Sequence, residues 1–101
     1  MEPTSLRFAR LARSLAQAAQ AQGLRAPTFR SPPRLPGVSR SIVRRGATVT
    51  VAVALRDRPW AAVVADMVEG VVVANRLAGV RADRVRAGLW RIADEVADLA
   101  A

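Results

Sequence analysis

Apolar side chains at every second position predict a β-strand over residues 48–55, buried on one face and open on the other. The inward side chains are Val49, Val51, Val53 and Leu55. If Arg45 and Gly46 form a two-residue turn, residues 38–44 return beside this strand as the other half of a β-hairpin. A longer turn that begins at Arg44 is the alternative, because Arg-Gly is a weaker turn signal than Asn-Gly.

The two-residue turn fixes a register in which Ile42 lies opposite Val49 and Arg40 lies opposite Val51. Ile42 then adds to the apolar face, but the Arg40 side chain projects from the same face. A guanidinium group in that position must reach the edge of the sheet or meet a charged partner. The hairpin therefore contains one arginine whose environment has to be explained.

The most apolar stretch, residues 59–77, predicts a long central helix. Asp57 is the expected N-cap and Pro59 lies in the first turn, a combination typical of a helix start. The apolar arc on a helical wheel consists of Trp60, Val63, Val64, Met67, Val71 and Ala74, widened by Val68 and Val72. An arc this wide can contact two layers at once. It is wider than one helix and one hairpin should fill, and this excess predicts contact with a second chain.

Two further helices are predicted at the two ends of the chain. Residues 4–22 have one apolar side, with Thr4 as a candidate N-cap and Gly23 at the C′ position. That side consists of Phe8, Leu11, Leu15, Ala18 and Gln22. In residues 81–100 the apolar side consists of Val85, Leu89, Ile92, Val96 and Leu99. The short break before the last helix predicts that it runs antiparallel to the central helix.

Four prolines separate the first helix from the hairpin, in residues 24–37. Proline excludes a helix and shifts the preceding residue towards extended geometry, so we expect an extended arm and no third strand. The arm carries Arg25, Arg30 and Arg34. Arg30, Pro33 and Pro36 also have the spacing of proline-rich ligands with a leading arginine, a pattern that often arises by chance.

Together these elements predict one small α+β domain over residues 1–101. A helix in residues 1–23 is followed by the arm in residues 24–37, and the hairpin and two helices occupy residues 38–101. A two-stranded sheet is marginal on its own in water. Either the helices cover its apolar face, or a second copy adds strands at its open edge. We expect a homodimer, formed through the hairpin edge or the central helix.

The composition excludes several kinds of chemistry. Cys, His, Lys and Tyr are absent, which excludes disulfides, thiolate or Ser-His catalysis, Schiff-base lysines and metal sites built on Cys or His. We therefore expect no enzyme, no cofactor and no metal. The alternative is a carboxylate enzyme or a hard-cation site at Asp66 and Glu69, which share a helix face, although solvated charge is the ordinary explanation.

Charge is distributed unevenly along the chain. Residues 1–56 contain ten Arg and one acidic residue, a net charge of +9, whereas residues 57–101 contain six Arg and seven acidic residues, a net charge of −1. All sixteen basic residues are Arg, which also fits a GC-rich bacterial genome, so the distribution is more informative than the choice of Arg over Lys. An excess of this kind in one half predicts a polyanionic partner.

From this distribution we expect a small basic protein that binds nucleic acid through phosphate contacts, with little base specificity. The predicted contacts are Arg25, Arg30, Arg34, Arg40, Arg44 and Arg45 on the arm and hairpin, and Arg7, Arg10 and Arg13 on the first helix. The alternative is an interaction or regulatory adaptor whose basic arm binds an acidic protein. The residues expected at a partner interface are Trp90, Met67 and Val71.

The two tryptophans are expected to differ in exposure. Trp60 points into the predicted core, whereas Trp90 lies at the edge of an apolar helix side, where half exposure is expected. Either ring can stack on a base, but packing is the better explanation for Trp60.

The sequence has no uncharged apolar run of about 18 residues, so we expect no membrane span and a cytoplasmic protein. An organelle presequence in residues 1–23 is a minor alternative, suggested by an Arg-rich and acid-poor composition.

Overall fold

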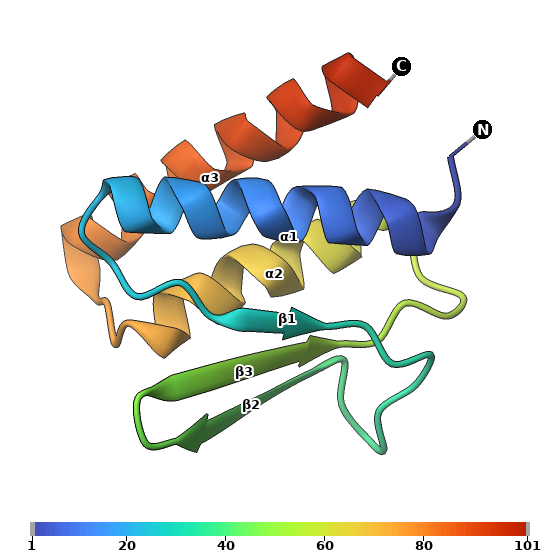
Figure 1. The fold of residues 1–101 in the computed structure, drawn as a ribbon, viewed down its shortest axis with the longest axis horizontal. Coiled ribbons are helices and arrows are strands. Elements are labelled where there is room, and N and C mark those ends of the chain that lie inside the picture. Colours follow the sequence, from blue (N-terminus) through green and yellow to red (C-terminus); the bar gives the residue numbers. More distant parts are fainter. Residues whose placement is uncertain (1, 101) are drawn as a thin grey trace.

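The computed structural model describes residues 2–100, and their side chains as far as residue 97. These residues form three helices and one three-stranded sheet (Figure 1). In chain order the elements are α1 (Thr4–Ala21), β1 (Thr28–Arg30), β2 (Arg40–Arg45), β3 (Thr48–Val53), α2 (Trp60–Ala74) and α3 (Gly79–Ala100). The mixed α+β class predicted from the sequence is confirmed, with a helix first, the strands next and two helices last.

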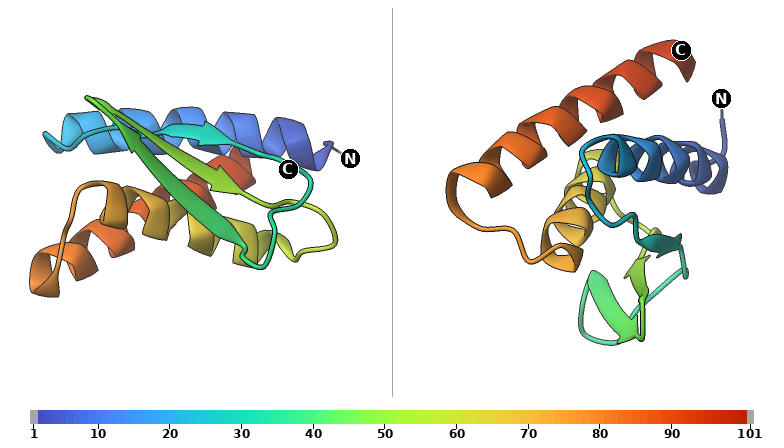
Figure 2. Two further views of the ribbon diagram at one scale, coloured as in Figure 1. Left: turned by 90° about the horizontal axis from the view of Figure 1, so that it is seen from below. Right: turned by 60° about the vertical axis from the view of Figure 1, so that its left-hand side comes forward.

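All three helices lie on one side of the sheet (Figure 2). α1 and α2 run side by side in the same direction, and α3 turns back across both of them on the side away from the sheet. α2 therefore contacts β2 and β3 on one side and α3 on the other, with α1 beside it. The opposite face of the sheet is not covered by any of the three helices (Figure 2).

The position of α2 explains its wide apolar arc within a single chain. Its buried residues are Val63, Val64, Asp66, Met67, Val68, Gly70, Val71, Val72 and Ala74. The predicted interface residues Met67 and Val71 are among them, each with 0% of its surface exposed. This burial corrects the expectation of a partner interface there, because α1, α3 and the sheet already cover both side chains.

The arm forms a third strand, contrary to the prediction made from its prolines. β1 pairs parallel to β3, on the edge opposite to β2. Residues 28–31 lie between Pro27 and Pro32 and keep their backbone N–H groups, so a short ladder can form there. The Phe29 ring packs edge to face on Phe8 of α1, with ring centroids 6.3 Å apart. This aromatic contact anchors the short strand to the helical layer.

The hairpin turn consists of Gly46 and Ala47, one residue later than predicted. The register is accordingly shifted by two residues, and Arg40 lies opposite Val53. Gly46 has a φ of 59° and takes the first central position of the turn, which suits the type II′ geometry of two-residue hairpins. Because a shift of two residues preserves the alternation of faces, Ile42 and Arg40 still point towards the helices.

Neither predicted N-cap is used. Pro3 precedes the first helical residue of α1, so Thr4 lies inside the first turn. Pro59 precedes α2, and Asp57 is two residues before it with a φ of 57°. Neither cap position makes a side-chain hydrogen bond to its helix. Both helices thus begin directly after a proline, whose fixed φ favours a sharp entry.

The C-termini of α1 and α2 share one geometry but differ in the residue that provides it. Each ends in a Schellman motif, in which the C′ residue adopts a left-handed conformation. Gly23 fills this position after α1, with a φ of 72°, as predicted. After α2 the position is filled by Arg76, with a φ of 53°, and the N–H of Leu77 donates to the Val72 carbonyl at 3.1 Å. α2 therefore ends three residues earlier than predicted, at Ala74.

The core lies between the sheet and the helices. Its largest fully buried side chains are Leu11, Leu15, Met67, Leu89, Val51, Val53, Val63, Val68 and Val71. α2 crosses β3 closely, since a Cβ atom at Gly70 would lie 2.6 Å from Cγ1 of Val51. On α1, Ala19 is fully buried and Gln22 is exposed, which corrects the predicted apolar side of that helix. None of the helices in residues 2–100 is long and apolar enough to cross a membrane.

Candidate functional site

The two arginines on the helix side of β2 contact different parts of α2. At the middle of the helix, Arg40 donates to Oδ1 of Asp66 at 2.9 Å, and Arg58, which precedes the helix, donates to Oδ2 at 2.5 Å. Asp66 is buried, and both arginines are partly buried. Of the two alternatives expected for Arg40, the edge of the sheet or a charged partner, the structure shows a charged partner. Arg40 therefore belongs to a partly buried ion-pair cluster, and this corrects its prediction as a displayed phosphate contact.

At the C-terminal end of α2, Arg44 caps the helix. Its Nη2 donates to the Val73 carbonyl at 2.7 Å and its Nη1 to the Ala74 carbonyl at 3.0 Å. These carbonyls are the negative end of the helix dipole, where a cation is stabilising. Arg44 is nevertheless exposed, so its remaining N–H donors face solvent.

Asn75 joins the arm to the same end of α2. Its Oδ1 accepts from the backbone N–H of Arg25 at 2.7 Å, and its Nδ2 donates to the Arg25 carbonyl at 2.9 Å. The Arg25 side chain then donates from Nη1 to the carbonyl of Ala47 in the hairpin turn, at 2.9 Å. Three segments that are distant in sequence are thus held together. No pattern in the sequence had pointed to Asn75.

These contacts border an open depression of about 400 Å³, which we name the tip pocket. Its lining residues are Arg25, Arg44, Gly46, Val49, Ala74, Asn75 and Arg76. Three arginines therefore share one concave surface. Arg25 and Arg44 are predicted contacts, whereas Arg76 was missed because it lies in the half of the chain that has almost no net charge. Arg76 lines the pocket because α2 ends at Ala74, whereas the sequence pattern places the end of this helix three residues later.

The uncovered face of the sheet carries a second basic group. Arg30 of β1 and Arg45 of β2, with Val43 and Thr50, line an open depression of about 310 Å³, the outer-sheet depression. Arg44 and Arg45 are adjacent in β2, so their side chains leave the strand on opposite faces. The end of the hairpin consequently carries guanidinium groups on both sides.

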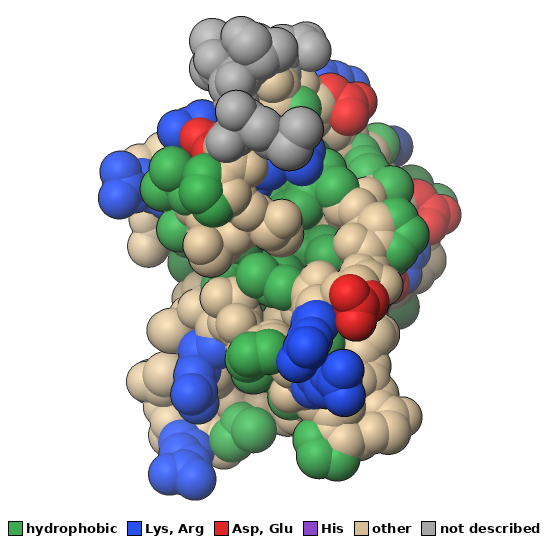
Figure 3. Space-filling model, turned by 90° about the vertical axis from the view of Figure 1, so that its right-hand side faces the viewer, with side chains coloured by type: hydrophobic (Ala, Val, Ile, Leu, Met, Phe, Trp, Pro, Cys, Tyr) green, Lys and Arg blue, Asp and Glu red, His purple; other side chains and the backbone are tan. Residues whose placement is uncertain are grey.

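The surface formed by the arm and the hairpin, residues 24–53, contains no acidic residue of its own. Its arginines, with the one added by the end of α2, are Arg25, Arg30, Arg34, Arg40, Arg44, Arg45 and Arg76. Apart from Arg40, none of them forms an ion pair with a carboxylate of residues 2–97. Arg34 is exposed on the arm. Figure 3 shows basic side chains spread over the lower part of one face, where the arm and the sheet lie, with acidic atoms beside some of them.

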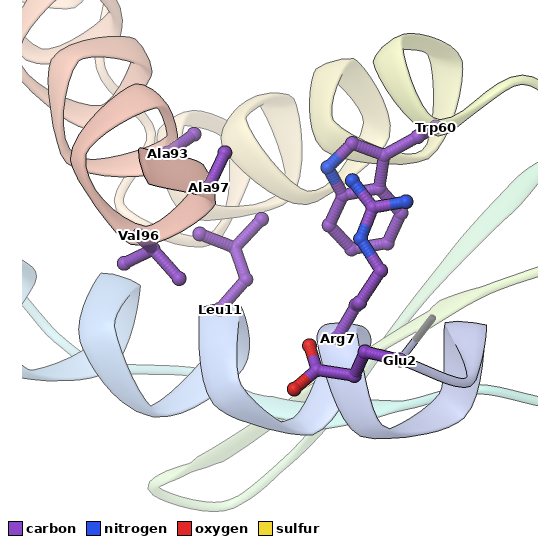
Figure 4. Close-up of a pocket in the computed structure, with 7 residues that line it drawn as sticks. All are labelled: Glu2, Arg7, Leu11, Trp60, Ala93, Val96 and Ala97. Atoms are coloured by element: carbon purple, nitrogen blue, oxygen red, sulfur yellow. The ribbon is translucent and has the colours of Figure 1, made fainter. Parts of the chain in front are cut away.

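The three arginines of α1 are not part of this surface. The Arg7 guanidinium lies over the ring of Trp60, 4.2 Å from its centroid (Figure 4). Arg10 pairs with Glu2 at 2.5 Å, and Arg13 is exposed. None of the three lines the tip pocket or the outer-sheet depression. The structure therefore does not bring them together with the arginines of the arm and hairpin.

The two tryptophans differ in exposure as predicted. Trp60 is partly buried against the core and is covered by Arg7, whereas Trp90 on α3 is 36% exposed. The cleft beside Trp60, bordered by Leu11 and Val96, encloses about 10 Å³ (Figure 4). That volume accommodates about one water molecule. Packing is therefore the role of Trp60, and the cleft is too small for a base.

The candidate carboxylate pair of α2 is divided between two groups of arginines. Glu69 accepts from Nε and Nη2 of Arg86, at 2.7 and 3.0 Å. The hydrogen bond from Arg86 is the main cause of the lowered pKa of Glu69, against the opposing effect of burial. Asp66 is buried between Arg40 and Arg58, which corrects its interpretation as a solvated charge.

Comparisons with protein-family models, with curated proteins and with solved structures found no match to this chain. No family or relative therefore assigns a role to the tip pocket or to the outer-sheet depression. Function has to be inferred from their geometry and charge.

Proposed function

We propose that this protein binds nucleic acid without strong base preference, through phosphate contacts made at the end of the hairpin and on the adjoining arm. One observation carries the proposal. Residues 24–53 contain six arginines and no acidic residue, and five of the six form no ion pair with a carboxylate of residues 2–97. An unpaired cationic surface of this kind favours contact with a dense array of negative charge.

The arrangement of these arginines suits a phosphate backbone. Arg44 projects from one face of the hairpin end beside Arg25, and Arg45 projects from the other face beside Arg30. Phosphates can therefore approach the hairpin end from both of its faces. Arg34 extends the charged surface along the arm.

Base recognition has little support on the uncovered face of the sheet. Besides the two arginines, the strand positions that face outwards carry Thr28, Ser41, Val43, Thr48, Thr50 and Ala52. Aromatic platforms are the usual basis of stacking on single strands, and Phe29 points to the opposite face, towards Phe8. Affinity should therefore come from charge, with little discrimination among bases.

The decisive experiment measures binding of labelled single-stranded and duplex oligonucleotides by fluorescence anisotropy over a series of salt concentrations. With about five phosphate contacts, log affinity should fall with log salt at a slope of roughly −4. The double variant Arg30→Thr with Arg45→Thr should weaken binding for every sequence and reduce the slope by about 2. Thr retains the preference for strand geometry, so the sheet should be preserved.

The matched control is Arg81→Ala with Arg84→Ala, which removes the same charge from an exposed part of α3. This control should retain most of the binding. Affinity that is indifferent to salt, or an equal loss in both double variants, would contradict the proposal.

A second candidate function is recognition of an acidic protein, and the outer edge of β2 is the observation that favours it. β2 is an edge strand, and no other strand of residues 2–100 pairs with its outer side. An extended acidic peptide could add a strand there and place its carboxylates beside the arginines. Titration with a poly-glutamate peptide, followed by backbone amide shifts, should then perturb β2, whereas phosphate contacts alone should perturb mainly arginine side chains.

The predicted homodimer remains a proposal, with the β2 edge as its most accessible site. Pairing of two β2 strands would bring Arg40, Arg44 and Arg45 of one copy near those of the other, and like charges across a strand pair are destabilising. Dimerisation should therefore increase with salt. Sedimentation velocity at low and high salt tests this, and a dimer that dissociates as salt rises would exclude the β2 edge.

A further inference from the structure

We propose that the tip pocket is a site for a terminal phosphate, the phosphate monoester at the end of a nucleic-acid strand. This assignment rests on the proposed function and narrows it from backbone phosphates in general to one kind of phosphate. A phosphate monoester carries close to two negative charges near neutral pH, whereas a backbone phosphodiester carries one. Three arginines on one concave surface, without a carboxylate of residues 2–97 beside them, match the higher charge.

Hydrogen bonds within the protein hold two arginines of the tip pocket in place. The backbone of Arg25 is fixed by both hydrogen bonds to Asn75, and its side chain is fixed by the Ala47 carbonyl. The Arg44 guanidinium is fixed by the last carbonyls of α2. Carbonyl groups orient these side chains without cancelling their charge, and each guanidinium retains further N–H donors. Pre-organised donors of this kind lose little entropy on binding an anion.

The end of α2 would by itself repel an anion, because the C-terminus of a helix carries partial negative charge. Arg44 removes this obstacle, since it occupies the carbonyls of Val73 and Ala74. Arg25 and Arg76 line the same space. The local field is therefore that of the guanidinium groups.

The backbone at Arg76 provides a separate observation. Its φ of 53° lies in the left-handed region, which costs a residue with a Cβ atom about 1–2 kcal/mol relative to the usual helical region. Gly fills the equivalent position after α1. Strained residues of this kind gather at functional sites. Here the strain places a third guanidinium on the pocket, which glycine would not provide.

The size of the tip pocket also fits a strand end. A volume of about 400 Å³ is larger than a phosphate group requires and lies within the usual range of small-ligand pockets, roughly 300–1,000 Å³. A terminal nucleotide together with its phosphate can therefore enter. The hairpin turn at Gly46 borders one side of the pocket, and the Asn75 link between arm and helix borders another.

The test compares three oligonucleotides of one sequence, with a phosphate at the 5′ end, at the 3′ end or at neither end. The protein should bind one phosphorylated form about tenfold more tightly than the unphosphorylated form, a difference of about 1.4 kcal/mol. Arg76→Gly should reduce this preference to less than about twofold. Because glycine favours the left-handed C′ position, the variant should unfold at the same temperature as the natural protein or higher.

Two further variants control for charge and for folding. Arg76→Asn removes the guanidinium while still tolerating the left-handed region, so it should behave like Arg76→Gly. Arg84→Ala removes one positive charge from the exposed side of α3 and should keep the tenfold preference.

The outcomes separate the two proposals. If all three oligonucleotides bind with equal affinity, the terminal-phosphate site is excluded and the proposed function stands. If none of them binds, the proposed function fails. If none binds but inorganic phosphate raises the unfolding temperature of the natural protein and not of Arg76→Gly, the pocket takes phosphate from another source, and its assignment to nucleic acid is overturned.

Discussion

Arg40 and Arg44 lie four residues apart on one face of β2, yet they have opposite fates. Arg40 is partly buried and shares Asp66 with Arg58. Arg44 is exposed and bonds to two carbonyl groups. The two differ in the part of α2 that they contact, which is a carboxylate at the middle of the helix for Arg40 and the helix C-terminus for Arg44.

The comparison shows why a count of arginines does not identify a binding surface. A carboxylate neutralises a guanidinium, and partial burial then leaves less of it open to a ligand. A carbonyl fixes a guanidinium and leaves its charge in place. The end of the hairpin with Arg44 is therefore suited to an external anion, and the end with Arg40 is suited to holding the fold together. Three changes test this division and a fourth tests a separate ion pair, from the largest expected effect to the smallest.

Asp66→Ala removes the carboxylate that pairs with Arg40 and Arg58. It leaves two partly buried guanidinium groups unpaired, which should lower the free energy of unfolding by about 3 kcal/mol. Chemical denaturation gives the value. Asp83→Ala is the control, because this exposed carboxylate pairs with Arg86 at 3.0 Å on the surface, and its loss should cost less than about 1 kcal/mol. Equal effects of the two changes would show that the cluster at Asp66 is not special.

Gly70→Ala tests the close crossing of α2 over β3, between Asp66 and the C-terminus of the helix. The added methyl group would lie 2.6 Å from Cγ1 of Val51, so the sheet and α2 must separate, at a net cost of about 1–2 kcal/mol. Gly88→Ala on α3 meets no atom within 4 Å and should stabilise the protein by up to about 1 kcal/mol through helix propensity. Opposite signs from the same substitution would confirm that contact with β3 decides the effect. A neutral Gly70→Ala would show that α2 can shift.

Arg44→Ala removes the side chain that caps the C-terminus of α2. Its hydrogen bond to Val73 is exposed and that to Ala74 is partly buried. Water can replace part of the lost hydrogen bonding, so the free energy of unfolding should fall by only about 1 kcal/mol. Affinity for oligonucleotides should fall in the same variant. A stability loss as large as that of Asp66→Ala would mean that Arg44 is mainly structural, and the division between the two ends would be lost.

Glu69→Gln tests the ion pair between Glu69 and Arg86, which includes neither Arg40 nor Arg44. The pKa of Glu69 is lowered in the folded state, so its stabilising effect is complete above the unfolded pKa of about 4.3 and is lost as the pH falls through the lower folded value. The pair is about one third exposed, so its contribution should stay below about 1 kcal/mol. The stability difference between the natural protein and Glu69→Gln should therefore shrink from pH 6 to pH 3. A difference that persists at pH 3 would exclude the ion pair as its cause.

The sequence predicts those features of this fold that depend on local periodicity. The alternation around Val51 identifies β3, and it places Arg40 correctly on the helix side even though the turn is misplaced by one residue. A charged partner of Arg40 is one of two expected outcomes, because a guanidinium on an inner face must reach the edge of the sheet or meet a charged group. The exposure of Trp90 follows in the same way from its place at the edge of a helical side.

The remaining features depend on contacts between distant segments. The three residues of β1 are too few to show a period, and their pairing requires the free edge of β3. The burial of Met67 and Val71 depends on three neighbouring elements, so a helical wheel could show only that their side of the helix is apolar. Arg76 joins the tip pocket because α2 ends at Ala74, and Asn75 reaches the arm across fifty residues of sequence.

The short length of β1 has a consequence for motion. The two strands of the hairpin are joined by a two-residue turn, whereas β1 pairs with a strand more than twenty residues away along only three positions. Segments with so few backbone contacts open before the rest of a domain unfolds, so hydrogen exchange should be faster in β1 than in β3. Because Arg25 lies just before β1, each such opening would loosen one wall of the tip pocket while the core stays intact.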